Sequence, residues 1–161
     1  MGNVYHGSVK SEWLDYNGHM NLAYYVLAFD LATDEYYKRL GVAENYNEIE
    51  KCSMFTTEIN VAYIKEMLNG QLFYVETYLN DYNAKLMHYL HQMRLTSTDE
   101  LVATNECLAI HVDMKTRRSS PFPASIQTVL QSDIDQQTVS SELKDTNLRL
   151  AIRKPLQDDR C

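Results

Sequence analysis

Cysteine is scarce in this chain, and its positions argue against two common ways of stabilising a small fold. The 161 residues include three cysteines, Cys52, Cys107 and Cys161. An odd number without a CxxC pair or a neighbouring pair of histidines is typical neither of a disulfide framework nor of a structural zinc site. The three histidines between residues 88 and 111 share no ligand spacing either. We therefore expect no disulfide and no metal.

A long apolar run is also missing. The longest uncharged apolar stretch falls far short of the ~20 residues that a helix needs to cross a membrane. Residues 1–6, Met-Gly-Asn-Val-Tyr-His, contain no basic segment followed by an apolar one, and His6 stands where an N-myristoylation signal needs serine or threonine. We expect a cytoplasmic protein without a membrane span and, from its length, a single domain.

Positive charge is in deficit, with 15 lysines and arginines against 22 aspartates and glutamates and a net charge of −7. A nucleic-acid surface needs clustered basic side chains that displace counterions from phosphates, so we expect no nucleic-acid partner. The one dense basic cluster of the sequence consists of Lys115, Arg117 and Arg118. It is either a solvated loop or a small site for phosphate groups.

Phenylalanine and tryptophan are few, at four and one, but the chain has twelve tyrosines. A tyrosine is a large ring with a polar tip, which suits half-buried surfaces, subunit interfaces and pockets for cations. Three of them, Tyr16, Tyr24 and Tyr25, lie close together in the sequence. Their rings either pack a helix or surround a cationic ligand.

The stretch with the most chemistry is residues 15–21, Asp-Tyr-Asn-Gly-His-Met-Asn, which directly precedes an apolar helical pattern. Gly18 lets the chain turn, and the start of a helix presents unpaired N–H groups that can stabilise an oxyanion. Asp15, on the approach to the turn, can attack a carbonyl or activate a water molecule. The same residue types also build ordinary turns, with Asn21 as a helix N-cap.

Apolar residues at helical spacing predict a helix over residues 21–40, with Gly41 as its C-terminal cap. The residues that set this spacing are Leu22, Tyr25, Val26, Phe29, Ala32, Tyr36 and Leu40. The first two turns carry no charge on any side, and a helix that is apolar all round is normally buried all round. We therefore expect a sheet to wrap its N-terminal half.

Alternation of apolar and polar residues predicts such a sheet. We expect strands over residues 3–13, 53–65, 72–79, 85–97 and 101–113, a bulge at Gly7, and a polar connection over residues 42–51. Turn residues between the last four strands, beginning with Asn69 and Gly70, predict three consecutive hairpins. The expected fold class is α+β, with an antiparallel sheet of five strands or slightly more wrapped round one long central helix.

The end of the chain is less regular. We expect a short helix over residues 124–130, and we divide the chain into a main domain, 1–130, and a partly irregular extension, 131–161, in which residues 148–153 return as a short strand. A single curved sheet leaves its edges uncovered, and a second copy commonly covers them. We therefore expect a homodimer or a dimer of dimers.

The turn, read with Tyr24, Tyr25 and the helix down to Gly41, resembles the hot-dog-fold thioesterases of the 4-hydroxybenzoyl-CoA type. Tyr63 and Gly70 fit the next part of that pattern, and residues 112–118 with the following prolines fit its last strand. The resemblance covers residues 4 to about 125. It implies hydrolysis of an acyl-CoA thioester, with Asp15 as nucleophile or general base and an oxyanion site at the amides of Met20 to Leu22.

Within these enzymes, residues 13–21 with Phe29 and residues 32–34 are similar to the thioesterases associated with carnitine degradation. That resemblance implies betainyl-CoA as the substrate and no cofactor besides the CoA of the substrate itself. The candidate site then has two catalytic residues, Asp15 and His19, and a basic cluster for CoA phosphates, Lys115, Arg117 and Arg118. Its candidate oxyanion and substrate residues are Asn17, Gly18, Met20, Asn21, Leu22, Tyr24 and Tyr25.

Two alternatives belong to other functional classes. The turn also resembles that of hot-dog enoyl-CoA hydratases, which add water across a double bond, although the proline of that motif is absent here and His19 comes one residue early. A non-catalytic acyl-CoA-binding protein is the other alternative. Sensors of that class usually carry a DNA-binding helix-turn-helix, for which this sequence has no residues left over.

Overall fold

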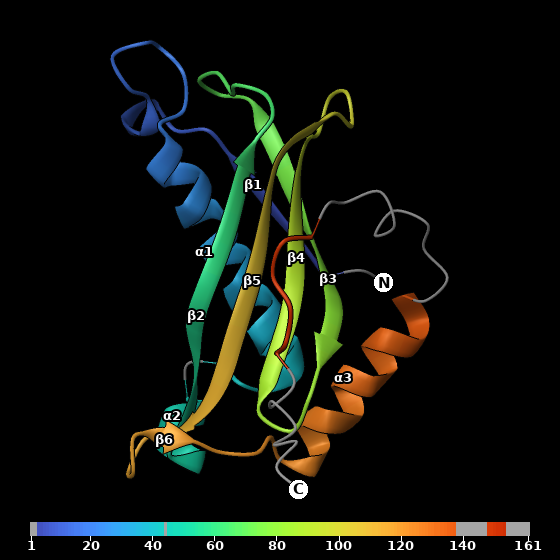
Figure 1. Ribbon diagram of the computed structural model, residues 1–161. Helices are drawn as coiled ribbons and strands as arrows, with labels where there is room; N and C mark the ends of the chain where they lie inside the picture. Colours follow the sequence, from blue (N-terminus) through green and yellow to red (C-terminus); the bar gives the residue numbers. More distant parts are fainter. Residues whose placement is uncertain (1–2, 44, 138–147, 154–161) are drawn as a thin grey trace, which may run out of the picture.

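The computed structural model describes residues 3–43, 45–137 and 148–153. One antiparallel sheet curves around a long helix, α1 (Leu22–Leu40) (Figure 1). The sheet order is β1 (Asn3–Ser8), β3 (Leu72–Tyr82), β4 (Leu86–Leu95), β5 (Leu101–Asp113) and β2 (Cys52–Tyr63), and the short β6 (Arg118–Ser119) pairs with β5. The predicted α+β class with one central helix is confirmed. Of the helices in the described segments, none combines the length and the apolar character that a membrane crossing requires.

The strand order corrects one prediction. Strands β3, β4 and β5 form two hairpins, but β2 pairs with β5 at the far edge and not with β3. The turn at Gly70 instead joins the β1 side of the sheet, because its amide donates to the carbonyl of Val9 and the amide of Val9 donates to the carbonyl of Gln71. Strand β2 therefore has one edge without a partner strand among the described residues.

Helix α1 begins and ends as its sequence predicts. The side chain of Asn21 accepts a hydrogen bond from the amide of Ala23 at 3.0 Å, and Gly41 closes the helix with a left-handed φ of 83°. The predicted burial on all sides is wrong within one chain. The face with Phe29 and Tyr36 is fully buried, whereas Leu22 is 64% exposed and Leu27 is 40% exposed.

Polar side chains lie in the core between α1 and the sheet. The ring of His91 is completely buried, and its two nitrogens lie 2.9 Å from the hydroxyls of Thr33 and Thr77. Burial lowers the pKa of His91 to about 3 because the protonated ring would lose its hydration. This histidine therefore belongs to the core as a neutral residue.

Three local predictions also change. The first strand ends at Ser8, and a single turn of 3₁₀ helix covers Ser11–Trp13. Gly7 makes no bulge, since the β1–β3 register is unbroken; a Cβ there would come within 2.5 Å of the Phe73 ring. The connection after α1 contains a short helix, α2 (Tyr46–Glu50), and buries the ring of Tyr46 and the side chain of Val42.

The last helix, α3 (Ala124–Gln137), is longer than predicted and runs through the expected boundary at residue 130. Its buried Asp133 accepts hydrogen bonds from Tyr36 and Arg39 of α1. Residues 148–153 dock on the opposite face of the sheet from α1 (Figure 1), where the amides of Arg149 and Leu150 donate to the carboxylate of Glu106. They dock without forming the predicted strand. Most of the expected irregular extension lies outside the described residues.

Candidate active site

The predicted turn is held in one conformation by its own hydrogen bonds. Oδ1 of Asp15 accepts from the amide of Asn17 at 2.8 Å, and the carbonyl of Asp15 accepts from the amide of Gly18 at 3.0 Å. The amide of Asp15 in turn donates to the carbonyl of His19. Gly18 has a φ of +82°, a conformation that favours glycine. Asn17 and Gly18 therefore shape the turn and leave the second oxygen of Asp15 available.

Asp15 opens into a cavity of about 300 Å³ between the turn, the start of α1 and the segment after β2. Its lining residues are Asp15, His19, Met20, Leu22, Tyr25, Tyr63, Ile64, Lys65 and Glu66. Nδ1 of His19 lies 3.9 Å from Oδ2 of Asp15, and its Nε2 lies 4.0 Å from Oε2 of Glu66. Both distances exceed a hydrogen bond, so the His19 ring lies between the two carboxylates without a hydrogen bond to either.

Backbone hydrogen bonds around the start of α1 occupy two of the three amides predicted to bind an oxyanion. The amide of Met20 donates to the carbonyl of Met67 at 2.8 Å, and the amide of Asn21 donates to the carbonyl of Trp13 at 2.9 Å. These two predicted donors are therefore occupied. Within the described part of the chain, the amide of Leu22 has no hydrogen-bond acceptor. Leu22 also lines the cavity with Asp15, which makes its amide the best donor for an oxyanion.

The tyrosines near the turn divide into different roles. Tyr16 is 99% exposed, and the ring of Tyr24 stacks on Trp13 at 5.5 Å with an interplanar angle of 13°. Neither lines the cavity. Tyr25 does, and its hydroxyl donates to the carbonyl of Lys65 at 3.2 Å. A cage of these three rings does not form within one chain.

Sequence analysis missed the second wall of the cavity, which consists of residues 63–66. These residues are the last residue of β2 and the three that follow it. They come to the turn because the carbonyl of Met67 accepts from the amide of Met20. The helix-turn pattern gives no local signal for such a contact. The family resemblance includes Tyr63 but predicts no contact between this residue and the turn.

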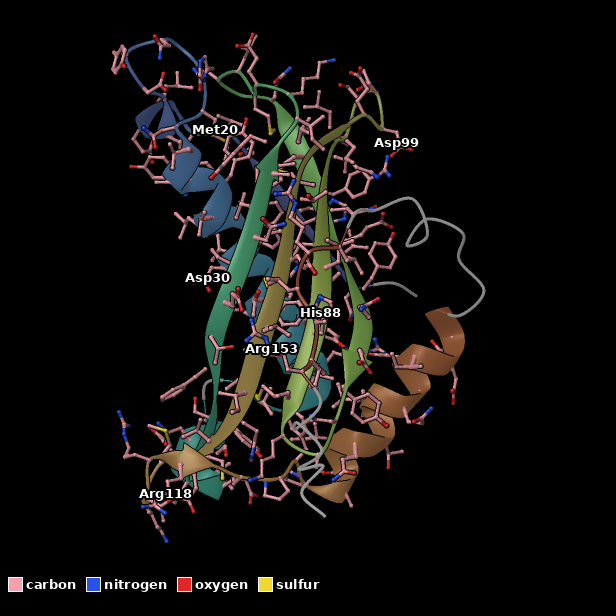
Figure 2. All side chains as sticks on the ribbon, viewed as in Figure 1. Met20, Asp30, His88, Asp99, Arg118 and Arg153 are labelled. Atoms are coloured by element: carbon pink, nitrogen blue, oxygen red, sulfur yellow. The ribbon has the colours of Figure 1, made fainter. Side chains whose placement is uncertain are left out.

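The basic cluster lies far from this cavity within one chain. Lys115 and Arg117 lie in the turn between β5 and β6, and Arg118 begins β6. Figure 2 shows Arg118 at the end of the sheet opposite Met20. The guanidinium of Arg117 lies over the ring of Phe55 on β2, 5.7 Å from its centroid. The structure therefore does not bring the predicted CoA cluster and Asp15 together in one chain.

A second cavity, of about 380 Å³, lies between α1, α2 and β2. Asp30, Thr33 and Asp34 line it from α1, and Met54 and Thr56 line it from β2. Figure 2 shows Asp30 well below Met20 along α1. Among the described residues, no group of three histidines, cysteines or carboxylates is placed to hold a metal ion in either cavity.

Comparison with known proteins decides the family. Residues 9–130 match the model of the thioesterase-like superfamily. The chain belongs to this family. A Staphylococcus aureus protein whose structure was solved in complex with CoA superposes with a TM-score of 0.82 at 27% identity, over 95% of this chain and 96% of that one. The predicted hot-dog fold and acyl-CoA thioesterase activity are confirmed.

Curated relatives point in the same direction. A betainyl-CoA thioesterase from Pseudomonas aeruginosa is 31% identical over 123 residues, which cover 76% of this chain and 77% of the relative. An L-carnitine dehydrogenase/betainyl-CoA thioesterase from Rhizobium meliloti is 31% identical over 122 residues, which cover 76% of this chain but 24% of that longer protein. This thioesterase thus spans about a quarter of the fused relative.

Proposed function

We propose that this thioesterase hydrolyses betainyl-CoA to glycine betaine and CoA. One observation supports the chemistry: Asp15 lines the same cavity as Leu22, whose amide has no hydrogen-bond acceptor among the described residues. The names of the P. aeruginosa and R. meliloti relatives support the acyl group. The reaction uses water and protein groups alone, without a cofactor.

In the proposed reaction the carbonyl carbon of the thioester faces Asp15. The carboxylate either attacks this carbon or removes a proton from the water molecule that attacks it. Both routes give a tetrahedral oxyanion, which the amide of Leu22 stabilises at the positive end of α1. The carbon–sulfur bond then breaks, and the CoA thiolate leaves and takes a proton. Attack by water gives the free acid directly, whereas attack by the carboxylate gives a mixed anhydride with Asp15, which a water molecule then hydrolyses to the free acid and the restored carboxylate. His19, whose ring nitrogens lie 3.9 Å from Asp15 and 4.0 Å from Glu66, is proposed to take part in binding or catalysis.

We further propose a homodimer through the free edge of β2. This edge and the adjoining face of α1 expose the apolar residues Leu22, Leu27, Ile59, Tyr63 and Ile64. A second copy is the occupant that matches them, because two β2 strands related by a two-fold axis pair in antiparallel orientation and continue the sheet. Pairing and apolar burial would then cover the edge and the exposed helix face together.

The same two-fold axis would complete the active site. Antiparallel pairing places the Tyr63 end of one β2 beside the Cys52 end of the other. The Tyr63 end carries Asp15, and the Cys52 end carries the basic cluster. Lys115, Arg117 and Arg118 of one copy would therefore lie near Asp15 of the other, where they could bind the phosphates of CoA.

Thiol release from a panel of CoA thioesters tests the proposed substrate. The informative pair is betainyl-CoA and 3,3-dimethylbutyryl-CoA, which has the same branched shape without the charge. We expect kcat/KM for betainyl-CoA to be at least about tenfold higher, equivalent to ~1.4 kcal/mol of transition-state binding. Equal turnover of the neutral analogue would remove the betaine assignment and leave thioester hydrolysis intact. Loss of an enoyl chromophore without thiol release would instead identify a hydratase.

A further inference from the structure

The wall of the catalytic cavity that faces Asp15 consists of aromatic rings whose hydroxyls already have partners. The rings of Tyr25 and Tyr63 meet edge to face, with centroids 5.2 Å apart and an interplanar angle of 88°. The hydroxyl of Tyr63 donates to the carbonyl of Leu22 at 3.1 Å, and that of Tyr25 donates to the carbonyl of Lys65. Since both hydroxyls are engaged, the part of these residues left for a ligand is the ring. Tyr63 is 47% exposed and can offer it.

The charges around the same cavity favour a cation. Asp15 and Glu66 contribute two carboxylates. Lys65 is the one lysine or arginine among the described lining residues, and its amine pairs with Glu100 at 2.7 Å. The hydrogen bond from Lys65 holds the pKa of Glu100 below its usual value and so keeps this carboxylate charged at neutral pH. The positive charge of Lys65 is thus compensated by Glu100, which lies outside the cavity, whereas Asp15 and Glu66 line the cavity.

A quaternary ammonium is the cation that this combination fits. It has no N–H to donate, so it needs ring faces and negative charge rather than hydrogen-bond acceptors. In a betainyl group a single methylene separates the nitrogen from the carbonyl carbon, and standard bond lengths put the two atoms about 2.5 Å apart. A carbonyl that reacts with Asp15 therefore places the ammonium in the Asp15 cavity itself.

The second cavity, although it contains Asp30 and Asp34, cannot serve the same role within one chain. Asp30 and Asp34 follow Leu22 by eight and twelve residues of α1, which at 1.5 Å per residue corresponds to roughly 12 to 18 Å. No betainyl group spans that distance from a carbonyl beside Leu22. The ammonium of a betainyl group therefore has to bind in the Asp15 cavity.

We propose that Tyr63 and Glu66, with Tyr25 behind them, form the binding site for the trimethylammonium group and determine the specificity of the enzyme for cationic acyl groups. This proposal rests on the proposed function and names the residues that recognise the acyl group. It replaces the cage of Tyr16, Tyr24 and Tyr25 that the sequence suggests. Glu66 attracts the charge directly and the ring face of Tyr63 attracts it by cation–π contact, so removing either one should weaken the reaction of the cationic substrate more than that of the neutral one.

Kinetics with the two matched thioesters test the site. The variants are Glu66→Gln, which removes the charge, and Tyr63→Leu and Tyr63→Phe, which remove and keep the ring. The control is Glu12→Gln, which removes an exposed carboxylate from the same end of the molecule outside the cavity. Turnover of 3,3-dimethylbutyryl-CoA shows that each variant is folded and catalytic.

We expect Glu66→Gln and Tyr63→Leu to lower kcat/KM for betainyl-CoA at least about tenfold relative to the neutral thioester. Tyr63→Phe and Glu12→Gln should leave that ratio within about twofold of wild type. An unchanged ratio in both Glu66→Gln and Tyr63→Leu would overturn the binding site while leaving betainyl-CoA as the substrate. A wild-type enzyme that does not prefer betainyl-CoA would overturn the proposed function as well.

A binding measurement separates these two failures without using betainyl-CoA. Tetramethylammonium should inhibit hydrolysis of the neutral thioester competitively in the wild-type enzyme, because it fills the space next to Asp15. Its inhibition constant should rise at least about tenfold in Glu66→Gln and stay unchanged in Glu12→Gln. Equal inhibition of wild type and Glu66→Gln would contradict a cation site at Glu66, whatever the natural acyl group is.

Discussion

Oδ1 of Asp15 accepts a hydrogen bond from the amide of Asn17 at 2.8 Å, so the carboxylate proposed to be catalytic also closes its own turn. The substitution Asp15→Asn therefore separates the role of this residue in the turn from its proposed role in catalysis. Asparagine keeps an oxygen for the amide of Asn17 but cannot act as a base or a carboxylate nucleophile. We expect kcat to fall by about 100-fold or more with little change in Tm.

The matched control for this substitution is Asp81→Asn. Oδ1 of Asp81 also accepts a hydrogen bond from a nearby backbone amide, that of Tyr82 at 2.8 Å, but Asp81 lies at the end of β3 outside the cavity. The control variant should keep wild-type kcat. If Asp15→Asn kept near wild-type turnover with the best substrate, another residue would have to be the catalytic carboxylate.

The parts of the fold that local signals specify were predicted well. Helix α1 was placed to within one residue because its apolar spacing is bounded by a capping asparagine, Asn21, and by Gly41 in the left-handed conformation. The strand order was not predicted, since β2 pairs with β5 across about 40 residues of intervening chain and a turn at Asn69 and Gly70 looks the same whether or not its flanking strands pair. Pairing of distant strands depends on tertiary packing.

In the candidate site too, residues that are close in the sequence were predicted, and residues that only the fold brings together were not. Asp15, His19 and Leu22 follow one another in a short stretch, and the resemblance identified them together. Tyr63 and Glu66 reach the cavity only through a contact between Met20 and Met67, which are 47 positions apart in the sequence. The stacking of Tyr24 on Trp13 was not predicted, because it depends on the path of the chain before the turn.

Subunit complementation provides a test of the proposed dimer and of the shared site. Asp15→Asn and a variant with Lys115, Arg117 and Arg118 all changed to alanine should each be impaired as homodimers. Co-expressed in equal amounts, they should form heterodimers in which one site has both Asp15 and the basic cluster intact. With half the dimers mixed and one of two sites working, about a quarter of wild-type kcat/KM should return.

Recovery of activity would require that Asp15 and the basic cluster act from different chains. If both acted within one chain, the mixture would show no more activity than the average of the two variants.

Sedimentation tests the proposed dimer interface through the variant Ile59→Glu, which places a charge on the exposed surface of β2. We expect this variant to sediment as a monomer at micromolar concentration, and a wild-type monomer under those conditions would contradict the interface.

Close packing of Gly7 against Phe73 predicts an effect on stability alone. A Cβ at position 7 would lie 2.5 Å from the aromatic ring, so the alanine side chain must displace it. We expect Gly7→Ala to lower the free energy of unfolding by about 1–3 kcal/mol, as measured by urea denaturation. Replacing Phe73 with leucine in the same chain should recover part of that loss. Gly7→Ala at wild-type stability would show that the ring moves freely.

Acid sensitivity of the fold should depend on His91. Its pKa is lowered to about 3 by burial. Within the described part of the chain its side-chain hydrogen bonds and ring contacts are with Thr33, Thr77, Phe29 and Tyr89, none of which is charged. An unfolded chain protonates this ring near pH 6.5, whereas the folded chain does so only near pH 3. Between these values the unfolded state binds one more proton, so stability falls as the pH falls. The slope from this group is about 1.4 kcal/mol per pH unit.

His91→Gln tests this assignment because glutamine can still contact Thr33 and Thr77 but does not titrate. The free energy of unfolding of both proteins should be measured by urea denaturation from pH 7 to pH 4. Acidic groups contribute equally to both curves, so the difference between the slopes isolates His91. We expect the variant to lose less stability, by about 1 kcal/mol per pH unit below pH 6. Parallel curves would mean that the buried ring takes up its proton without unfolding.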